Sequence, residues 1–260
     1  IKEKDGTIKN IKEINDTNIL IELNPYVTHN STFSIFNSEP KPIDYHKIKN
    51  DVARSNGYRC IDIWDWDDRN KIINLLLEKP KVYARKCVVR EVDTKTAINY
   101  INQYHLQGYS RAKIKLGLFY QDELVSIMTF SKPRYNKHYE YELVRYCSNY
   151  NVVGGAEKLF KSFVCNYNPQ SIISYCDLSK FNGTVYNKLG FKLDNISIGK
   201  HWYNPKTKEH ILDSLLLKHG FDRLLGEKYG TFGKGISNKE LMLQNNFVEI
   251  YDAGQARYVW

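Results

Sequence analysis

The sequence predicts a mixed α/β protein, because short apolar runs that fit buried strands alternate with segments that fit helices. Residues 114–130 contain two apolar runs around the polar triplet 121–123, which is the pattern of a β-hairpin. Residues 152–192 predict a helix that opens at the double glycine 154–155, then the buried strand 171–177, and then a second helix ending in Tyr-x-Lys-Leu-Gly-Phe. A chain of 260 residues can bury the cores of one or two such domains.

The first unit, residues 1–80, is expected to contain a strand, a helix, a strand and a helix. Residues 18–23 form an apolar strand with a glutamate near its end. The first helix begins at Asp44, a residue type that caps helices, and a glycine ends it before the second strand at 58–64. Residues 69–77 supply the second helix.

The second unit, residues 81–217, begins with a strand at 87–93 and a helix at 95–104 that Thr94 caps. The hairpin follows, and residues 141–147 add a further strand before the double glycine. These elements predict one mixed sheet.

The third unit, residues 218–260, is expected to form a small α/β appendage packed on the second unit. Two segments, 221–229 and 237–245, have helical character, and the second opens with the capping signal Ser-Asn-Lys-Glu. Residues 247–251 and 257–260 predict a terminal hairpin.

Positive charge is unevenly distributed along the chain. The net charge is +9, yet residues 1–80 hold 12 basic and 13 acidic side chains. The remaining 180 residues therefore carry all of the excess, and they are also rich in tyrosine. Cations interleaved with aromatic rings suit phosphate contact and base stacking, so DNA is the expected partner, although a generic lysine-rich surface would give the same counts.

The cysteines and the hydropathy of the chain argue against several classes of protein. The five cysteines include no Cys-x-x-Cys pair, which disfavours a disulfide scaffold and a structural zinc site. The sequence shows no signal peptide and no membrane span, so we expect a cytoplasmic protein that does not bind membranes. A first residue of Ile1 rather than Met indicates a fragment or a processed product.

The double glycine and the Tyr-x-Lys-Leu-Gly-Phe ending resemble the core of GNAT-type N-acyltransferases, over about residues 83–202. The resemblance implies a mixed sheet with helices on both faces. It also implies that Gly154, Gly155 and Ala156 hold the pyrophosphate of an acyl-CoA, because glycines at a helix start let backbone N–H groups approach an anion. Tyr186 stands where such enzymes place a tyrosine beside the thiolate.

Two features set this chain apart from active acyltransferases. The segment 151–156, NVVGGA, lacks the Gly-x-Gly run that wraps a pyrophosphate, which disfavours acyl transfer. The segments 104–108, YHLQG, and 132–136, KPRYN, resemble instead the Mom-like branch of this fold, which occurs in phage DNA-modification proteins and attached to phage endonucleases.

The first unit carries residue types that metal-assisted phosphodiester cleavage needs. Glu22 and Asp44 offer carboxylates for Mg²⁺, and His29 and His46 can move protons or contact the phosphate. Together with residues 57–64, GYRCIDIW, they resemble the Vsr/EDxHD branch of the PD-(D/E)xK nucleases found in phage homing endonucleases. The resemblance implies a partial restriction-endonuclease-like unit acting in an infected bacterial cell.

One expected nuclease residue has no clear counterpart. The aspartate that such enzymes carry on the preceding strand aligns with Ile11, and the nearest acids are Glu13 and Asp16. The aligning element lies in a missing N-terminal part, one of these acids replaces it, or the site is degenerate.

DNA contact is expected along the basic linker 79–86 and at cations of the second and third units. The candidate residues are Lys81, Arg85, Lys132, Arg134, Arg145, Lys228 and Lys234.

Three functions stay open on the sequence. The favoured one is a Mg²⁺-dependent DNA endonuclease with a basic GNAT-fold module that contacts DNA. The alternatives are a Mom-like acyltransferase that modifies DNA and uses acyl-CoA, and a catalytically inactive DNA-binding protein.

Overall fold

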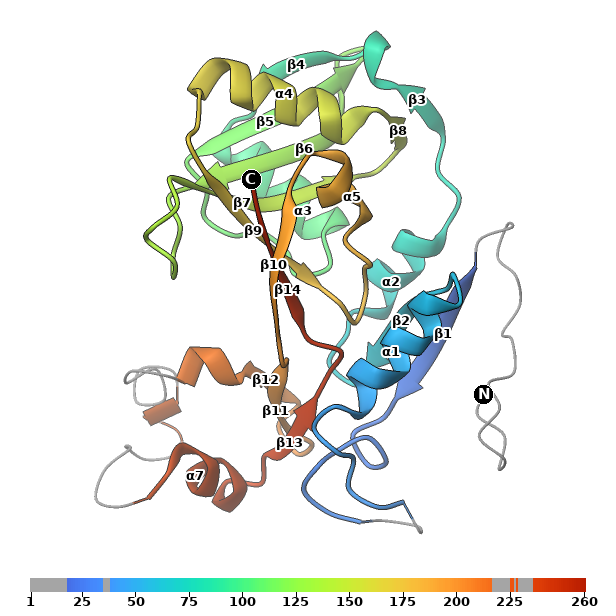
Figure 1. Cartoon of the computed structure of the whole chain (residues 1–260), viewed down its shortest axis with the longest axis vertical. Helices are drawn as coiled ribbons and strands as arrows, with labels where there is room; N and C mark the ends of the chain where they lie inside the picture. Colours follow the sequence, from blue (N-terminus) through green and yellow to red (C-terminus); the bar gives the residue numbers. More distant parts are fainter. Residues whose placement is uncertain (1–17, 35–37, 217–224, 227, 229–235) are drawn as a thin grey trace. The chain divides into compact units, whose positions relative to one another are not determined.

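The computed structural model describes residues 18–34, 38–216, 225–226, 228 and 236–260 (Figure 1). The chain divides into two compact units, each assembled from segments that are far apart in the sequence. The three consecutive units expected from the sequence do not coincide with this division. Unit 1 comprises Ile1–Asp67, Asp177–Asn182 and Ile196–Gln255, and unit 2 comprises Asp68–Cys176, Gly183–Asn195 and Ala256–Trp260.

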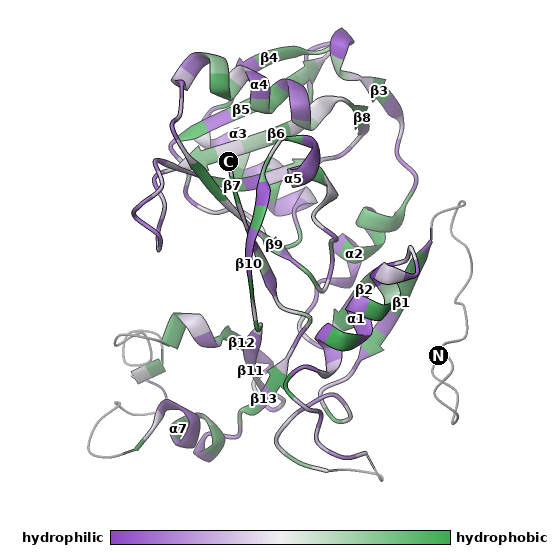
Figure 2. Cartoon of the chain, in the orientation of Figure 1, coloured by the Kyte–Doolittle hydropathy of each residue, from purple (hydrophilic) through white to green (hydrophobic). Residues whose placement is uncertain are grey.

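Unit 1 begins with a strand–helix–strand motif, as predicted. Strands β1 (Ile19–Asn24) and β2 (Arg59–Trp64) are parallel, with Glu22 paired opposite Asp62. Parallel neighbours need a crossover connection, and helix α1 (Tyr45–Ser55) supplies it. Figure 2 shows that β1 and β2 are largely hydrophobic, whereas α1 mixes polar and apolar residues.

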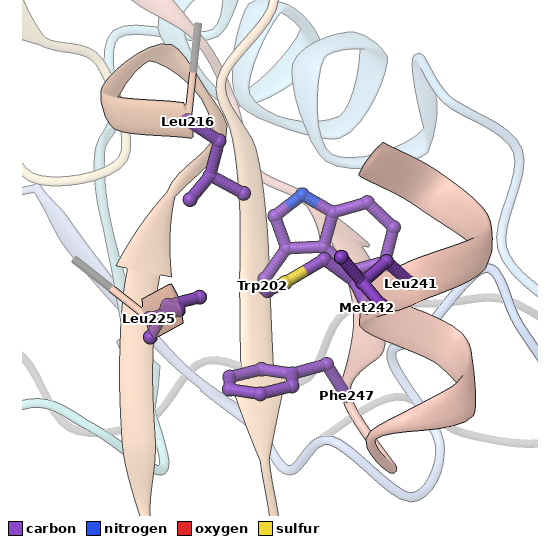
Figure 3. Close-up of a cluster of buried hydrophobic side chains, with 6 residues drawn as sticks. All are labelled: Trp202, Leu216, Leu225, Leu241, Met242 and Phe247. Atoms are coloured by element: carbon purple, nitrogen blue, oxygen red, sulfur yellow. The ribbon is translucent and has the colours of Figure 1, made fainter. Parts of the chain in front are cut away.

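A three-stranded sheet forms the other part of unit 1. Its order is β12 (Glu209–Leu212), β11 (Lys200–Asn204) and β13 (Val248–Tyr251). The short helix η2 (Asp213–Leu216) and helix α7 (Asn238–Gln244) accompany it. Trp202 of β11 is fully buried at the centre of an apolar cluster (Figure 3), whose other members are Leu216, Leu225, Leu241, Met242 and Phe247.

The predicted terminal hairpin is wrong. Strand β13 pairs with β11, and strand β14 (Gln255–Val259) leaves for the large sheet of unit 2. Local sequence could not reveal this, because each strand finds its partner far away in the chain. The helix expected over 221–229 falls largely outside the described residues.

Unit 2 contains a seven-stranded mixed sheet of order β10-β14-β9-β7-β6-β5-β4. The predicted hairpin is confirmed: β5 pairs with β6 across Gln121 and Asp122, whose positive φ angles of 48° and 64° fit a tight two-residue turn. Strand β9 is parallel to β7. The strands are β4 (Val88–Glu91), β5 (Ile114–Tyr120), β6 (Glu123–Ser131), β7 (Tyr141–Ser148), β9 (Ile172–Asp177) and β10 (Lys192–Ser197).

Helices cover both faces of this sheet, which confirms the predicted mixed α/β class. Phe163 of α4 (Gly155–Tyr167) stacks on Phe130 at 3.6 Å between ring centroids. Helix α3 (Thr94–Tyr104) packs Ala97 and Ile101 against Ile127, which lies on the opposite face of β6. Helices α2 (Arg69–Leu76) and α5 (Thr184–Lys188) complete the unit.

The helix caps differ from prediction in two places. Asp93, not Thr94, caps α3, because its side chain accepts a hydrogen bond from the Thr96 N–H. Asp44 occupies the N-cap position of α1, but its side chain makes no capping hydrogen bond. The predicted capping box at Ser237 of α7 is confirmed.

The segment expected to be a plain linker contains a strand. Residues β3 (Lys81–Tyr83) pair in parallel with β8 (Asn151–Val153), and the short helix η1 (Ala84–Lys86) follows β3. None of the described helices combines the length and apolar character needed to cross a bilayer.

Candidate functional site

The face of β1 and β2 that α1 covers changes from apolar to polar along the strands. Its first layer is apolar, with Leu20, Cys60 and Ala53 in one cluster. Alternation along the strands brings Glu22 and Asp62 to the next layer, and Asn24 and Trp64 to the one after. Polar side chains therefore occupy positions where this motif would ordinarily extend its core.

Helix α1 completes these layers with side chains spaced one turn apart. His46, Asn50 and Ala53 are its buried residues. The Asn50 side chain meets Asp62, and the His46 ring lies against Trp64 with 4.8 Å between centroids. The buried face of the helix therefore changes from apolar to polar along its length, as the strand face does.

Asp62 is fully buried and bonded on both carboxylate oxygens. Asn24 Nδ2 donates to Oδ1 at 2.9 Å, and Asn50 Nδ2 donates to Oδ2 at 2.8 Å. Burial raises the pKa of Asp62, while Lys49 and the two amide donors oppose that rise. Because both amides must turn their NH₂ groups to Asp62, their oxygens point away from it.

Glu22 forms an ion pair with Lys49 of α1, and both side chains retain partial exposure, 20% and 17%. Within the described residues, Glu22, Cys60 and Asp62 form the group of possible metal ligands, with ligand atoms within 4.8 Å of one another. Burial raises the pKa of Cys60 to about 12, which disfavours the thiolate form that binds metals.

The remaining donors suit a cation that prefers oxygen. The Asn24 and Asn50 side-chain oxygens are buried without a hydrogen-bond partner. Together with the Glu22 carboxylate they offer hard oxygen ligands of the kind that Mg²⁺ takes. Buried polar atoms left unpaired are rare and call for an explanation, and a bound divalent cation beside Glu22 is one that matches the chemistry of these oxygens.

The two predicted catalytic histidines lie together. His29 Nδ1 and His46 Nε2 are 3.4 Å apart. His46 is buried, and burial together with the neighbouring His29 lowers its pKa to about 3, so it stays neutral at physiological pH. His29 is only half-buried, so it is the histidine of the pair that a substrate can reach.

Asp44 is exposed at the start of α1 and is not a member of the group around Glu22. Asp62 occupies the place beside Glu22 that the sequence interpretation gave to Asp44. A signal for Asp62 was present, because it is the one acid inside the apolar run 58–64 and shares a strand face with Cys60 and Trp64. The region of Ile11, Glu13 and Asp16 lies outside the described residues.

A second polar chain in unit 1 was not foreseen. Asp252 Oδ2 lies 2.9 Å from His201 Nε2, and His201 Nδ1 lies 2.8 Å from His210 Nε2. These residues are brought together by the register of β11 with β12 and β13. They are separated by up to 51 residues, so no local motif announces them.

Unit 2 gives the double glycine a structural explanation. Gly154 caps α4 with φ of 76°, a left-handed conformation that favours glycine. A Cβ at Gly155 would approach Val152 to 3.0 Å. Lys158 of α4 holds this helix to the segment after β3, since its Nζ donates to the carbonyls of Ala84 and Cys87 at 2.9 and 2.6 Å.

The first turn of α4 carries features for and against an anion site. Ala156 is buried in that turn, which has no side-chain cap. Glu157 adds a negative charge there and disfavours a pyrophosphate. Tyr186 donates its hydroxyl hydrogen to the Tyr175 carbonyl at 2.9 Å and accepts from Ser174 at 3.0 Å, and burial raises its pKa.

An opening in the sheet lies near these residues in the chain. Both β7 and β9 are described in full, and their parallel pairing runs from Tyr141 opposite Ile172 to Leu143 opposite Ser174. Beyond that point β7 continues to Ser148 without a pairing to β9. Side chains occupy two carbonyls of this stretch, because Arg145 donates to Val144 and the Tyr186 hydroxyl donates to Tyr175.

The predicted DNA-contacting cations differ in how free they are. Lys81 and Arg85 both lie over the Tyr83 ring, 5.4 and 5.0 Å from its centroid, and both are exposed. Lys132 and Arg134 are exposed as well, with Lys132 5.1 Å from the centroid of the Tyr141 ring and the Arg134 guanidinium donating to Ser110 Oγ. Arg145 donates to the carbonyls of Gly108 and Val144, and Lys228 pairs with Glu209, while Lys234 lies outside the described residues.

Comparison with known proteins adds little. No family model matches the chain, and no curated protein matches it. Among solved structures, an acetyltransferase from Bacillus subtilis in complex with CoA aligns over 67% of this chain and 97% of its own, at 12% identity and a TM-score of 0.34. A likeness this distant supports no conclusion about this chain, so its function must be argued from its own residues.

Proposed function

We propose that unit 1 is a metal-assisted phosphodiesterase that cleaves DNA. The observation that carries the proposal is the gathering of Glu22, His29 and His46 with unpaired amide oxygens on the one face of β1 and β2 that should be core. Buried polar groups cost free energy unless they are satisfied, so such a cluster is retained for a purpose.

Each residue has a role that follows from its surroundings. Glu22, Asn24 and Asn50 would hold the cation, which when bound polarises a phosphoryl oxygen and neutralises developing charge. Asp62 keeps the two amides in the required orientation. Lys49 balances the charge of Glu22. A cation that takes over the carboxylate would release Lys49 to contact a phosphate oxygen.

The two histidines would have different roles because His29 is half-buried and His46 is buried. His29 can donate a hydrogen bond to a phosphate oxygen because it is half-buried. His46 contacts His29 and would hold its ring in position. His46 itself stays neutral, since its pKa is about 3. The exposed cations of unit 2, with Tyr83 and Tyr135 beside them, support binding to the DNA backbone.

The test is cleavage of supercoiled plasmid by the purified chain with Mg²⁺, with EDTA as the metal-free control. Glu22→Gln removes a ligand charge at nearly constant shape, and we expect at least a roughly 100-fold loss of nicking, since even outer-shell changes cost about 10- to 100-fold. Asp51→Asn is the matched control, a partly exposed carboxylate on α1 that should leave the rate unchanged. Equal nicking by wild type and Glu22→Gln contradicts the proposal.

A second candidate function is acyl-CoA binding by unit 2, which the opening between β7 and β9 favours. Glu157 in the first turn of α4 opposes it, and the Lys158 ammonium group of that turn is already bonded to the Ala84 carbonyl. Calorimetric titration of the chain with acetyl-CoA separates the two, because binding that Gly154→Val abolishes would establish the acyl-CoA site, and no heat of binding would remove this candidate.

A further inference from the structure

Two lysines approach the ring of Tyr45 beside the Glu22 cluster. The Nζ atoms of Lys41 and Lys49 lie 5.2 and 5.3 Å from the centroid of that ring. At these distances an ammonium group is attracted by the face of an aromatic ring. Tyr45, Lys41 and Lys49 are all half-buried, so each keeps part of its surface open to solvent.

The local fold brings these three side chains together. Tyr45 and Lys49 are four residues apart on α1, so they lie on the same side of the helix. Lys41 belongs to the segment that leads into α1. Its N–H donates to the Asn30 carbonyl at 2.7 Å, and its Nζ donates to Ser38 Oγ at 3.3 Å. Both the backbone and the side chain of Lys41 are therefore held beside the start of the helix.

Direct contacts connect this group to the residues proposed to act on DNA. The Tyr45 ring meets the His46 ring edge-on, with 4.9 Å between centroids, and it lies 6.2 Å from the His29 ring. Lys49 forms the ion pair with Glu22. The tyrosine and at least one of its two lysines thus touch the proposed site itself.

The charge of Lys41 also acts on that site. Burial and His29 are the main causes that lower the pKa of His46 to about 3, Asp252 opposes them, and the charge of Lys41 adds to the decrease. Because the interaction between charges falls with distance, this effect agrees with the position of Lys41 over the Tyr45 ring.

The charges of this group leave an excess that an anion would balance. Lys41 and Lys49 carry one positive charge each, and the divalent cation proposed at Glu22 would add two. Against these four positive charges stand two carboxylates, Glu22 and the buried Asp62. A DNA strand carries one negative charge about every 3.4 Å along its axis, so two neighbouring phosphates would match the excess of two.

We infer that Lys41 and Lys49, held on the ring of Tyr45, bind two successive phosphates of one DNA strand. The inference rests on the function proposed for unit 1. Lys49 contacts the phosphate that is cut, once the cation has released it from Glu22, and Lys41 contacts the neighbouring phosphate. Tyr45 is a positioning residue, because its ring holds both ammonium groups. The three side chains bind and orient the strand, and no covalent step passes through them.

The salt dependence of DNA binding tests the inference in the full chain without cleavage. Labelled duplex DNA is titrated in EDTA at several salt concentrations, and fluorescence anisotropy gives the slope of log affinity against log salt. Lys41→Ala should reduce the magnitude of this slope by about 0.9, since one phosphate contact is lost, and Lys41→Arg should leave it unchanged. Glu22→Gln should increase the magnitude by about 0.9, because it frees Lys49 from its ion pair.

Two further comparisons separate phosphate contact from a general loss of charge or of packing. Lys47→Ala is the matched control, because Lys47 lies on the same helix but pairs with Asp51, and its slope should equal that of wild type. Tyr45→Phe keeps the ring and should keep the slope. Tyr45→Leu removes the ring face and should reduce the slope. Wild-type slopes for both Lys41→Ala and Glu22→Gln would overturn the inference.

Plasmid nicking distinguishes a failure of this inference from a failure of the proposed function. If wild type nicks DNA, Lys41→Ala should raise KM about 10-fold, the effect of one hydrogen bond to a charged group, with kcat unchanged. Wild-type KM and salt slope in Lys41→Ala would refute the phosphate site and leave the proposed function standing. If wild type does not nick DNA but the slopes change as expected, the proposed function fails and the phosphate site stands.

Discussion

The two units differ most in what they bury. Of the fifteen buried polar or charged residues in the described chain, eleven belong to unit 1 and four to unit 2, namely Ser126, Thr129, Glu142 and Ser174. In unit 2 the hydroxyls of Ser126 and Ser174 close local hydrogen bonds to the neighbouring strand. In unit 1 the polar residues bond to one another, through Asp62 and through Asp252.

This difference separates a scaffold from a site. A sheet with apolar layers on both faces gains its stability from burial, and its few polar groups are incidental to that. A unit that gives up core positions to acids, amides and histidines loses stability there. The loss is understandable if those residues carry the reaction, and this is the reason for which we propose a reactive site in unit 1.

The largest loss of unfolding free energy should come from truncating a residue of the apolar cores, and it should be equal in the two units. Trp202→Ala in unit 1 and Phe163→Ala in unit 2 each remove a fully buried aromatic ring, so each should lower the free energy of unfolding by about 3–5 kcal/mol. Urea denaturation followed by circular dichroism measures both. A negligible cost for either variant would mean that its cluster is not a core.

Polar truncation should distinguish the units. Asp62→Ala leaves two buried amide donors unpaired and should cost about 3 kcal/mol, because each unsatisfied group costs about 1–3 kcal/mol. Ser174→Ala in unit 2 removes one buried hydroxyl and should cost about 1 kcal/mol. Equal losses of unfolding free energy for the two variants in the same denaturation experiment would contradict this difference between the units.

Lowering the pH should reduce the stability of the folded chain through His46. Its pKa is about 3 in the folded chain, whereas the ordinary value is 6.5, so the unfolded chain binds more protons between these values. Stability therefore falls as the pH drops below 6.5, by at most about 1.4 kcal/mol per pH unit for this group.

Asp177 has the opposite effect on the pH dependence of stability. Burial and the nearby Asp252 raise its pKa to about 6, so between pH 4 and 6 the folded chain binds more protons at this site and gains stability as the pH falls. Replacing His46 by Gln should thus flatten or reverse the loss of stability between pH 6 and 4. An unchanged slope in urea titrations across that range would show that His46 is not held neutral.

The smallest effect concerns DNA binding by the surface cations. Lys81→Ala with Arg85→Ala in unit 2 should reduce the slope of log affinity against log salt by about 2, since each phosphate contact contributes about 0.9. Lys228→Ala should change little, because Lys228 pairs with Glu209. Fluorescence anisotropy with labelled duplex DNA at several salt concentrations measures both, and equal slopes for all variants would remove unit 2 from the DNA interface.

Local signals in the sequence located most elements correctly. The strand–helix–strand of unit 1, the hairpin at 121–123 and the capping box at Ser237 each depend on contiguous residues, and each was predicted. The proximity of His29 to His46 was also anticipated by assigning both to one site. Glu22 was placed on its strand, but its neighbour Asp62 was overlooked inside an apolar run.

Features that depend on distant pairing were not accessible. Strand β14 joins a sheet whose other members end at residue 197, and β3 pairs with a strand seventy residues later in the chain. The same holds for His201, His210 and Asp252, which meet only because β11 pairs with both β12 and β13. Pattern and propensity describe neighbours along the chain, and these contacts are set by sheet register.

The central claim is that the reactive site lies in unit 1, and one plasmid assay tests it most directly. Supercoiled plasmid with Mg²⁺ is incubated with wild type, Glu22→Gln and Gly154→Val in parallel. The account predicts nicking by wild type and Gly154→Val, and none by Glu22→Gln. Nicking that survives in Glu22→Gln but disappears in Gly154→Val would contradict it and move the chemistry to unit 2.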